Sequence, residues 1–179
     1  MYLSVWTRPD VSYAVNVLAR HLNFASPKLI GAARRIFQYL KGTRTHGITF
    51  YKTNPTNRKA TLYAYSDASD ADDPIARRTT GGYIVFYNGS PVSWSTGLQR
   101  LTTLSTCESE YVQAALAAKE ILYLREMLLF AGHPQRDSTP LYEDNEAALK
   151  LSENPIARSM TKHIARRFHF LRQCSEDKH

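Results

Sequence analysis

A long helical pattern set between short strands constrains the fold more than any other feature of this sequence. It runs from about Thr106 to Phe130, with apolar residues at the three- and four-residue spacing of one helix face. Ser105 and Glu108 predict a capping box at its start, and Gly132 predicts its end. The residues expected on its buried face are Tyr111, Ala114, Ala115, Ala118, Ile121 and Leu122.

Short strand patterns lie on both sides of this helix. Three precede it, and Asn88-Gly89-Ser90 predicts a hairpin turn between the second and the third. A fourth follows it, so the predicted strands are residues 60–67, 81–88, 91–96 and 138–144. The predicted fold class is α/β: three antiparallel strands, a crossover helix and a fourth strand parallel to the first, with flanking helices.

The first 59 residues show a different pattern and are predicted to form two helices and a strand. The first helix is expected to begin near Pro9, and the second to run from Ser26-Pro27, an N-cap and first-turn proline, to Gly42. The strand is expected over residues 48–51, and the turn-prone residues 52–59 mark a boundary. Beyond the fourth strand we expect a short helix at 145–152 and a basic helix from about Thr161 to Gln173.

The net charge of +7 is distributed unevenly along the chain. Residues 1–60 carry ten basic residues and one acidic residue, residues 61–152 carry seven and twelve, and residues 153–179 carry six and three. An acidic centre with basic flanks suits a polyanion that meets carboxylates near a divalent metal, and nucleic acid fits this description. A solvated charged surface is the alternative interpretation.

Cysteine content and hydropathy predict the compartment. The two cysteines, Cys107 and Cys174, are too few for a disulfide framework and lack metal-ligand spacing, so free thiols in a reducing compartment are expected. The chain has no run of eighteen apolar residues and no basic and apolar leader at its start. An intracellular protein without a membrane span is therefore expected.

Three acidic residues stand where this topology could bring them together. Asp67 ends the first strand, Asp144 ends the fourth, and Glu110 lies in the first turn of the crossover helix. Three converging carboxylates repel each other, and divalent metal removes that conflict. Two such ions about 4 Å apart can activate a water and stabilise the leaving oxygen of a phosphodiester. By spacing alone, roles in turns and helix caps explain the same acids.

Eight segments, in order, resemble the C-terminal part of the Pol polyprotein of copia-type LTR retrotransposons. They are TRPD (7–10), YLKGT (39–43), YSDAS (65–69), RRTTGGY (77–83), PVSWST (91–96), STCESEY (105–111), YEDNEAA (142–148) and TKHIARRFHF (161–170). In that family, this region is the end of the reverse transcriptase followed by a ribonuclease H domain, which cuts the RNA strand of RNA–DNA hybrids by two-metal hydrolysis. The resemblance implies a small helical reverse transcriptase remnant at 1–59 and a ribonuclease H-like mixed sheet at 60–179.

The resemblance also implies roles for the three acids. The catalytic and metal-binding carboxylates of the family fall on Asp67, Glu110 and Asp144, with Mg²⁺ or Mn²⁺ as the implied cofactor. The family's fourth carboxylate lies in a later segment of the form ADIFTK, after one more strand, and has no counterpart before His179. We therefore expect an incomplete two-ion site and impaired activity. The alternative is a catalytically inactive fragment that binds nucleic acid or another protein.

The implied partners are nucleic acid, such as an RNA–DNA hybrid, and the remainder of the Pol polyprotein, with no membrane. The implied location is a cytoplasmic virus-like particle, and it could include a nuclear phase. Basic residues on the predicted helices are candidates for phosphate contacts, which position a duplex without reading its sequence, or for a solvated face. They are Arg34, Arg35, Lys41, Arg166, Arg167 and Arg172.

Overall fold

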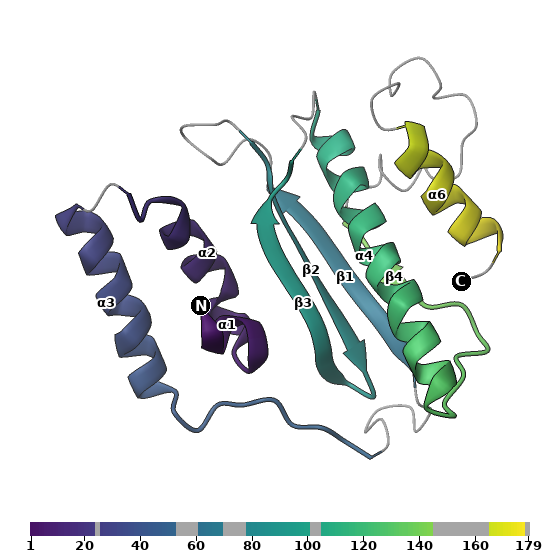
Figure 1. Ribbon diagram of the computed structural model, residues 1–179, viewed down its shortest axis with the longest axis horizontal. Helices are drawn as coiled ribbons and strands as arrows, with labels where there is room; N and C mark the ends of the chain where they lie inside the picture. Colours follow the sequence, from purple (N-terminus) through teal and green to yellow (C-terminus); the bar gives the residue numbers. More distant parts are fainter. Residues whose placement is uncertain (24–25, 53–60, 70–77, 101–104, 145–164, 178–179) are drawn as a thin grey trace.

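The computed structural model describes residues 1–23, 26–52, 61–69, 78–100, 105–144 and 165–177. A four-stranded mixed sheet forms its centre, in the order β3-β2-β1-β4 (Figure 1). The strands are β1 (Leu62–Ser69), β2 (Thr80–Tyr87), β3 (Ser90–Leu98) and β4 (Leu141–Tyr142).

The strand pairing confirms the predicted class. β1 and β3 both run antiparallel to β2, whereas β4 pairs in parallel with β1, with Tyr65 opposite Tyr142. The β2–β3 hairpin turns at Asn88 and Gly89, whose φ angles of 54° and 80° are those that an Asn-Gly turn supplies. The chain is therefore an α/β protein with a mixed sheet and flanking helices, consistent with a ribonuclease H-like fold.

Helix α4 (Thr106–Phe130) connects β3 to β4 and packs on β1 and β2. The Ser105 hydroxyl accepts a hydrogen bond from the Glu108 backbone N–H at 3.2 Å, and Gly132 follows the last turn with a φ of 81°. Both helix ends thus form where the sequence predicts. The buried core between this helix and the sheet consists of Leu62, Ala64, Val85 and Ile121.

Helix α6 (Ala165–Glu176) packs against α4 on the side away from the sheet (Figure 1). All residues from 109 to 115 are buried, because this part of α4 is covered by neighbours on more than one side. The predicted last helix is thus present from residue 165, and its expected first turn at 161–164 lies outside the described residues. The helix expected at 145–152 lies outside them too. Among the described residues, no helix has the length and apolar character needed to cross a membrane.

The first part of the chain lies beside β3 (Figure 1). It contains α1 (Tyr2–Trp6), the 3₁₀ helix η1 (Pro9–Val11), α2 (Ser12–Arg20) and α3 (Pro27–Gly42). Two side chains connect it to the strand: the Trp94 indole N–H donates to the Ser4 carbonyl at 2.7 Å, and the Asn16 amide donates to the Thr96 carbonyl at 3.0 Å. The first 23 residues therefore pack on the sheet through directed hydrogen bonds.

This region corrects two predictions. Helix α1 was not expected, and the helix expected from Pro9 begins as η1 and continues as α2. The strand expected over residues 48–51 is absent, although those residues are described. The Thr49 carbonyl accepts a hydrogen bond from the Ser90 hydroxyl of the β2–β3 hairpin at 2.6 Å. A side-chain contact of this kind does not build a strand ladder. The division into domains at residues 59 and 60 stays a prediction.

Two of the eight matching segments contact each other. Arg8 of TRPD is 7% exposed, and its guanidinium binds the Asp10 carboxylate at 2.7 Å. The same guanidinium donates to the carbonyl and the hydroxyl of Thr43, at 3.0 and 2.7 Å, and the Tyr39 hydroxyl donates to Asp10 at 2.8 Å. Thr43 and Tyr39 belong to YLKGT, so these segments together fasten the end of α3 to η1.

Replacing Arg8 by Lys is expected to lower the midpoint of thermal unfolding. A lysine ammonium cannot reproduce the planar fork that binds Asp10 and Thr43 at once, although it keeps the charge. Circular dichroism during heating measures the effect. Arg44→Lys is the control, because Arg44 is exposed and lies just after the end of α3, close to Thr43 in the chain. Equal midpoints for the two variants would contradict the fastening role.

Candidate metal centre

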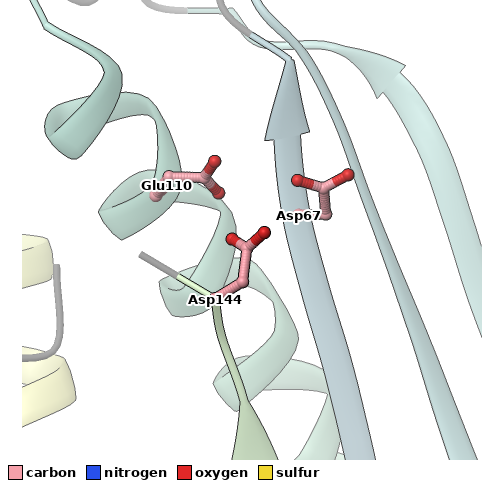
Figure 2. A group of neighbouring side chains, drawn as sticks. All are labelled: Asp67, Glu110 and Asp144. Atoms are coloured by element: carbon pink, nitrogen blue, oxygen red, sulfur yellow. The ribbon is translucent and has the colours of Figure 1, made fainter. Parts of the chain in front are cut away.

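The parallel pairing of β1 with β4 brings two of the predicted acids to one level. Tyr65 lies opposite Tyr142, and two residues further along each segment come Asp67 and Asp144. Glu110 reaches the same place from the first turns of α4 (Figure 2). Each of the three residues offers a carboxylate oxygen, and these oxygens lie within 4.8 Å of one another. The structure therefore joins all three predicted acids in one cluster.

The strand alternation leaves Asp67 open to solvent. Residues 62, 64, 66 and 68 of β1 are buried, whereas Asp67 is exposed. Its partner in the neighbouring strand is Gly82, which has no side chain to cover it. Asp144 is exposed as well. Two of the three carboxylates can therefore be reached by a ligand from solvent.

Glu110 is the buried member of the cluster, at 6% exposure. Its Oε2 atom is inaccessible to solvent and has no hydrogen-bond partner within the described residues. Burial, and then the negative charges of Glu143, Asp67 and Asp144, raise the pKa of Glu110 to about 8. A buried carboxylate with an unpartnered oxygen beside two others is the arrangement that a hard divalent cation satisfies. The all-oxygen donor set thus fits Mg²⁺ or Mn²⁺.

The sequence interpretation missed a fourth carboxylate at this place. Glu143 precedes Asp144, and its Oε2 accepts a hydrogen bond from the Ser66 hydroxyl at 2.8 Å. Its Oε1 accepts from the backbone N–H of Asp144 at 3.2 Å. The signal available in the sequence was the pair of successive acids, Glu143 and Asp144, at the end of a strand. Successive side chains of a strand point to opposite faces of the sheet, so the two acids approach the cluster from different faces.

The predicted phosphate-binding residues belong to two helices, α3 and α6. Arg34, Arg35 and Lys41 are exposed on α3, which packs on α2, and Figure 1 places α3 and α6 on opposite sides of the sheet. Arg172 of α6 pairs with Glu176 at 2.7 Å. The side chains of Arg166 and Arg167 lie outside the described part. Among the described side chains, those of Arg34, Arg35 and Lys41 thus lie on the other side of the sheet from Arg172.

Comparison with known proteins identifies the family. Over 177 residues the chain is 34% identical to a retrovirus-related Pol polyprotein from transposon TNT 1-94 of Nicotiana tabacum, which covers 99% of this chain. Over 167 residues it is 38% identical to the corresponding polyprotein from transposon RE1 of Arabidopsis thaliana, which covers 93% of this chain. Over nearly its whole length, the chain is homologous to copia-type retrotransposon Pol polyproteins. It spans 13% and 11% of the lengths of these two Pol polyproteins.

A third relative aligns with the chain over most of its own length, unlike the two Pol polyproteins. It is the secreted RxLR effector protein 161 of Plasmopara viticola, 40% identical over 124 residues, and the match covers 69% of this chain and 84% of the effector. No protein-family model and no solved structure matches the chain. The predicted resemblance to copia-type Pol is confirmed, because similarity to Pol polyproteins extends over nearly the whole chain.

Proposed function

We propose that this stretch of Pol is a ribonuclease H: a metal-dependent endonuclease that cleaves the RNA strand of RNA–DNA hybrids during reverse transcription. The first 59 residues would then be the end of the reverse transcriptase. The observation that carries the proposal is the cluster of Asp67, Glu110 and Asp144, whose oxygens lie within 4.8 Å of one another. The ribonuclease H-like sheet topology supports it.

In the proposed mechanism, Asp67, Glu110 and Asp144 hold the divalent ions. Mg²⁺ or Mn²⁺ would supply an activated water and charge stabilisation of the leaving oxygen. Glu110 extends from α4 and is buried, so its carboxylate is held in place on the helix side of the site. Asp67 and Asp144 are exposed and leave the solvent side free for a phosphodiester. The chain itself contributes three carboxylates that lie close together, and two of them are accessible from solvent.

The proposed partners are an RNA–DNA hybrid and the remainder of the Pol polyprotein. The exposed basic residues of α3, Arg34, Arg35 and Lys41, suit phosphate contacts. Because α3 lies beside α2 and away from α4, such contacts would bind a part of the duplex remote from the cleaved bond. Binding to this helix is expected to weaken as salt rises.

Metal removal tests the proposal directly. The purified chain is expected to cleave the labelled RNA strand of a hybrid in Mg²⁺, to lose that activity in EDTA, and to regain it when Mg²⁺ is restored. A DNA duplex of the same sequence is the control and should stay intact. No cleavage of the hybrid in Mg²⁺ or Mn²⁺ would contradict the proposal.

A second candidate function is an interaction module without catalysis. The relative from Plasmopara viticola supports it, because the aligned stretch makes up 84% of a protein named as a secreted effector. A related stretch therefore makes up most of a protein that is named as an effector and not as a Pol polyprotein. Hybrid binding by the unmodified chain without cleavage in any divalent metal would favour this second candidate.

A further inference from the structure

Gln99 connects the end of β3 to the turn of α4 that carries Glu110. Its side-chain amide donates to the Ser109 carbonyl at 2.8 Å, and this hydrogen bond is buried. Ser109 directly precedes Glu110 and is itself fully buried. The backbone N–H of Gln99 donates in turn to the Thr79 carbonyl at 2.9 Å, so Gln99 is fixed through its backbone as well as its side chain. The helix turn that carries Glu110 is therefore tethered to the sheet.

The Gln99 side chain carries a cost that a purely structural residue would avoid. Gln99 is 4% exposed, and its Oε1 atom is inaccessible to solvent and has no hydrogen-bond partner within the described residues. A buried polar atom without a partner costs free energy, whereas an apolar side chain of similar shape leaves no such atom. The amide at this place is therefore better explained by what its N–H group holds than by its own contribution to stability.

Gly81 allows α4 to approach the sheet closely beside Asp67. It lies opposite Ala68, the residue that follows Asp67, and both are buried on the face of the sheet that α4 covers. A methyl group on Gly81 would overlap the side-chain amide of Gln113. Gln113 is 3% exposed, so its side chain has little room to move aside. It lies three residues beyond Glu110, on the same side of the helix.

The tether at Ser109 and the close contact at Gln113 fix α4 on both sides of Glu110. When all three acids are ionised, the charges of Asp67 and Asp144 repel that of Glu110. The Oε2 atom of Glu110 is buried and has no hydrogen-bond partner within the described residues, so backbone position and packing decide where it lies. A small outward shift of the helix would thus carry this oxygen beyond the reach of a shared ion.

We propose that Gln99 and Gly81 are positioning residues of the metal centre. Gln99 holds the first turns of α4 to the end of β3. Gly81 lets the same helix lie close to the sheet, so that Glu110 reaches Asp67 and Asp144. Neither residue is a ligand itself; both act through the place of Glu110. This inference rests on the proposed function, because it assigns both residues to the same site.

Mn²⁺ affinity and metal-free stability together test the role of Gln99. Mn²⁺ binding to the full chain is measured by electron paramagnetic resonance at one fixed pH, and stability by the midpoint of thermal unfolding in EDTA. Gln99→Met removes the donor to Ser109 and also the unpartnered oxygen, two changes with opposite effects on stability. We expect Mn²⁺ affinity to fall about tenfold, while the midpoint stays close to that of the unmodified chain. Gln38→Met, at an exposed position of α3, should change neither.

Gly81→Ala tests the close approach of the helix, and a compensating change tests its cause. The added methyl group meets the Gln113 amide, so Mn²⁺ affinity should fall in this variant. Gln113→Ala in the same chain removes that overlap and should restore most of the affinity. A general loss of stability would not be repaired by shortening a second buried side chain.

The outcomes separate positioning from a structural role. Unchanged Mn²⁺ affinity in Gln99→Met and Gly81→Ala overturns the inference. A lower midpoint with unchanged affinity in Gln99→Met marks a structural tether and overturns the role of Gln99. Failure of Gln113→Ala to restore the affinity lost in Gly81→Ala overturns the role of Gly81. Absence of Mn²⁺ binding in the unmodified chain overturns the proposed function, and the inference with it.

Discussion

Asp67→Asn is expected to reduce the rate of the proposed hybrid cleavage by a factor of at least ~100, while the fold and the binding of the hybrid should persist. The side chain of Asp67 is exposed, so an amide of the same shape fits in its place. What changes is one of the three carboxylates that we propose would hold the ions. A hundredfold loss corresponds to about 2.7 kcal/mol of transition-state stabilisation, within the several kcal/mol that a bound metal supplies.

Single-turnover cleavage of a hybrid labelled on its RNA strand measures the effect in saturating Mg²⁺. Asp144→Asn should behave in the same way, because it removes an equivalent exposed ligand. Asp137→Asn is the control: Asp137 is an exposed acid outside the cluster, and its loss should leave the rate unchanged. Cleavage by Asp67→Asn at the rate of the unmodified chain would remove the cluster from the mechanism.

We expect the metal-free chain to lose stability as the pH rises from about 4.5 to about 8, the interval between the ordinary pKa of a glutamate and that of Glu110. In this interval the unfolded chain has released the proton and the folded chain still holds it. The unfolded state thus binds fewer protons, and the free energy of unfolding falls with pH. The shift corresponds to about 3–5 kcal/mol.

Urea unfolding at several pH values, in EDTA, measures this fall. Glu110→Gln should flatten the profile, because it removes the group that titrates, and saturating Mg²⁺ should flatten it as well, because a cation neutralises the ionised carboxylate. Glu126→Gln, at an exposed position of the same helix, should retain the slope. A profile that rises between these pH values would mean that Glu110 does not hold its proton in the fold.

Local signals explain why most of the fold could be predicted. Helix α4 begins after Ser105 and ends before Gly132 because a hydroxyl cap and a left-handed glycine act within a few residues of the chain. The hairpin at Asn88 depends in the same way on a turn that two residues determine. The cluster of three acids could be anticipated because topology and motif both indicate where strand ends and the first helix turn meet.

Features that depend on tertiary partners could not be predicted in this way. Residues 48–51 have the composition of a strand, yet no strand in the described part of the chain pairs with them. Helix α1 is only five residues long, and it lies where Trp94 reaches the Ser4 carbonyl from β3. The place of Glu143 required the pairing of β4 with β1, since only that pairing brings it to Ser66.

The shortness of β4 affects how easily this strand separates from β1. This strand has two residues, and the Ala64 backbone N–H donates to the carbonyl of Pro140, which directly precedes it, at 2.9 Å. Short segments at the edge of a sheet open locally at low free-energy cost. Exchange of the Ala64 amide hydrogen with solvent should therefore be faster than that of β1 amides bonded to β2, and an ion shared by Asp67 and Asp144 should slow it. An ion at this place would thus hold the ends of β1 and β4 together, in addition to its proposed part in cleavage.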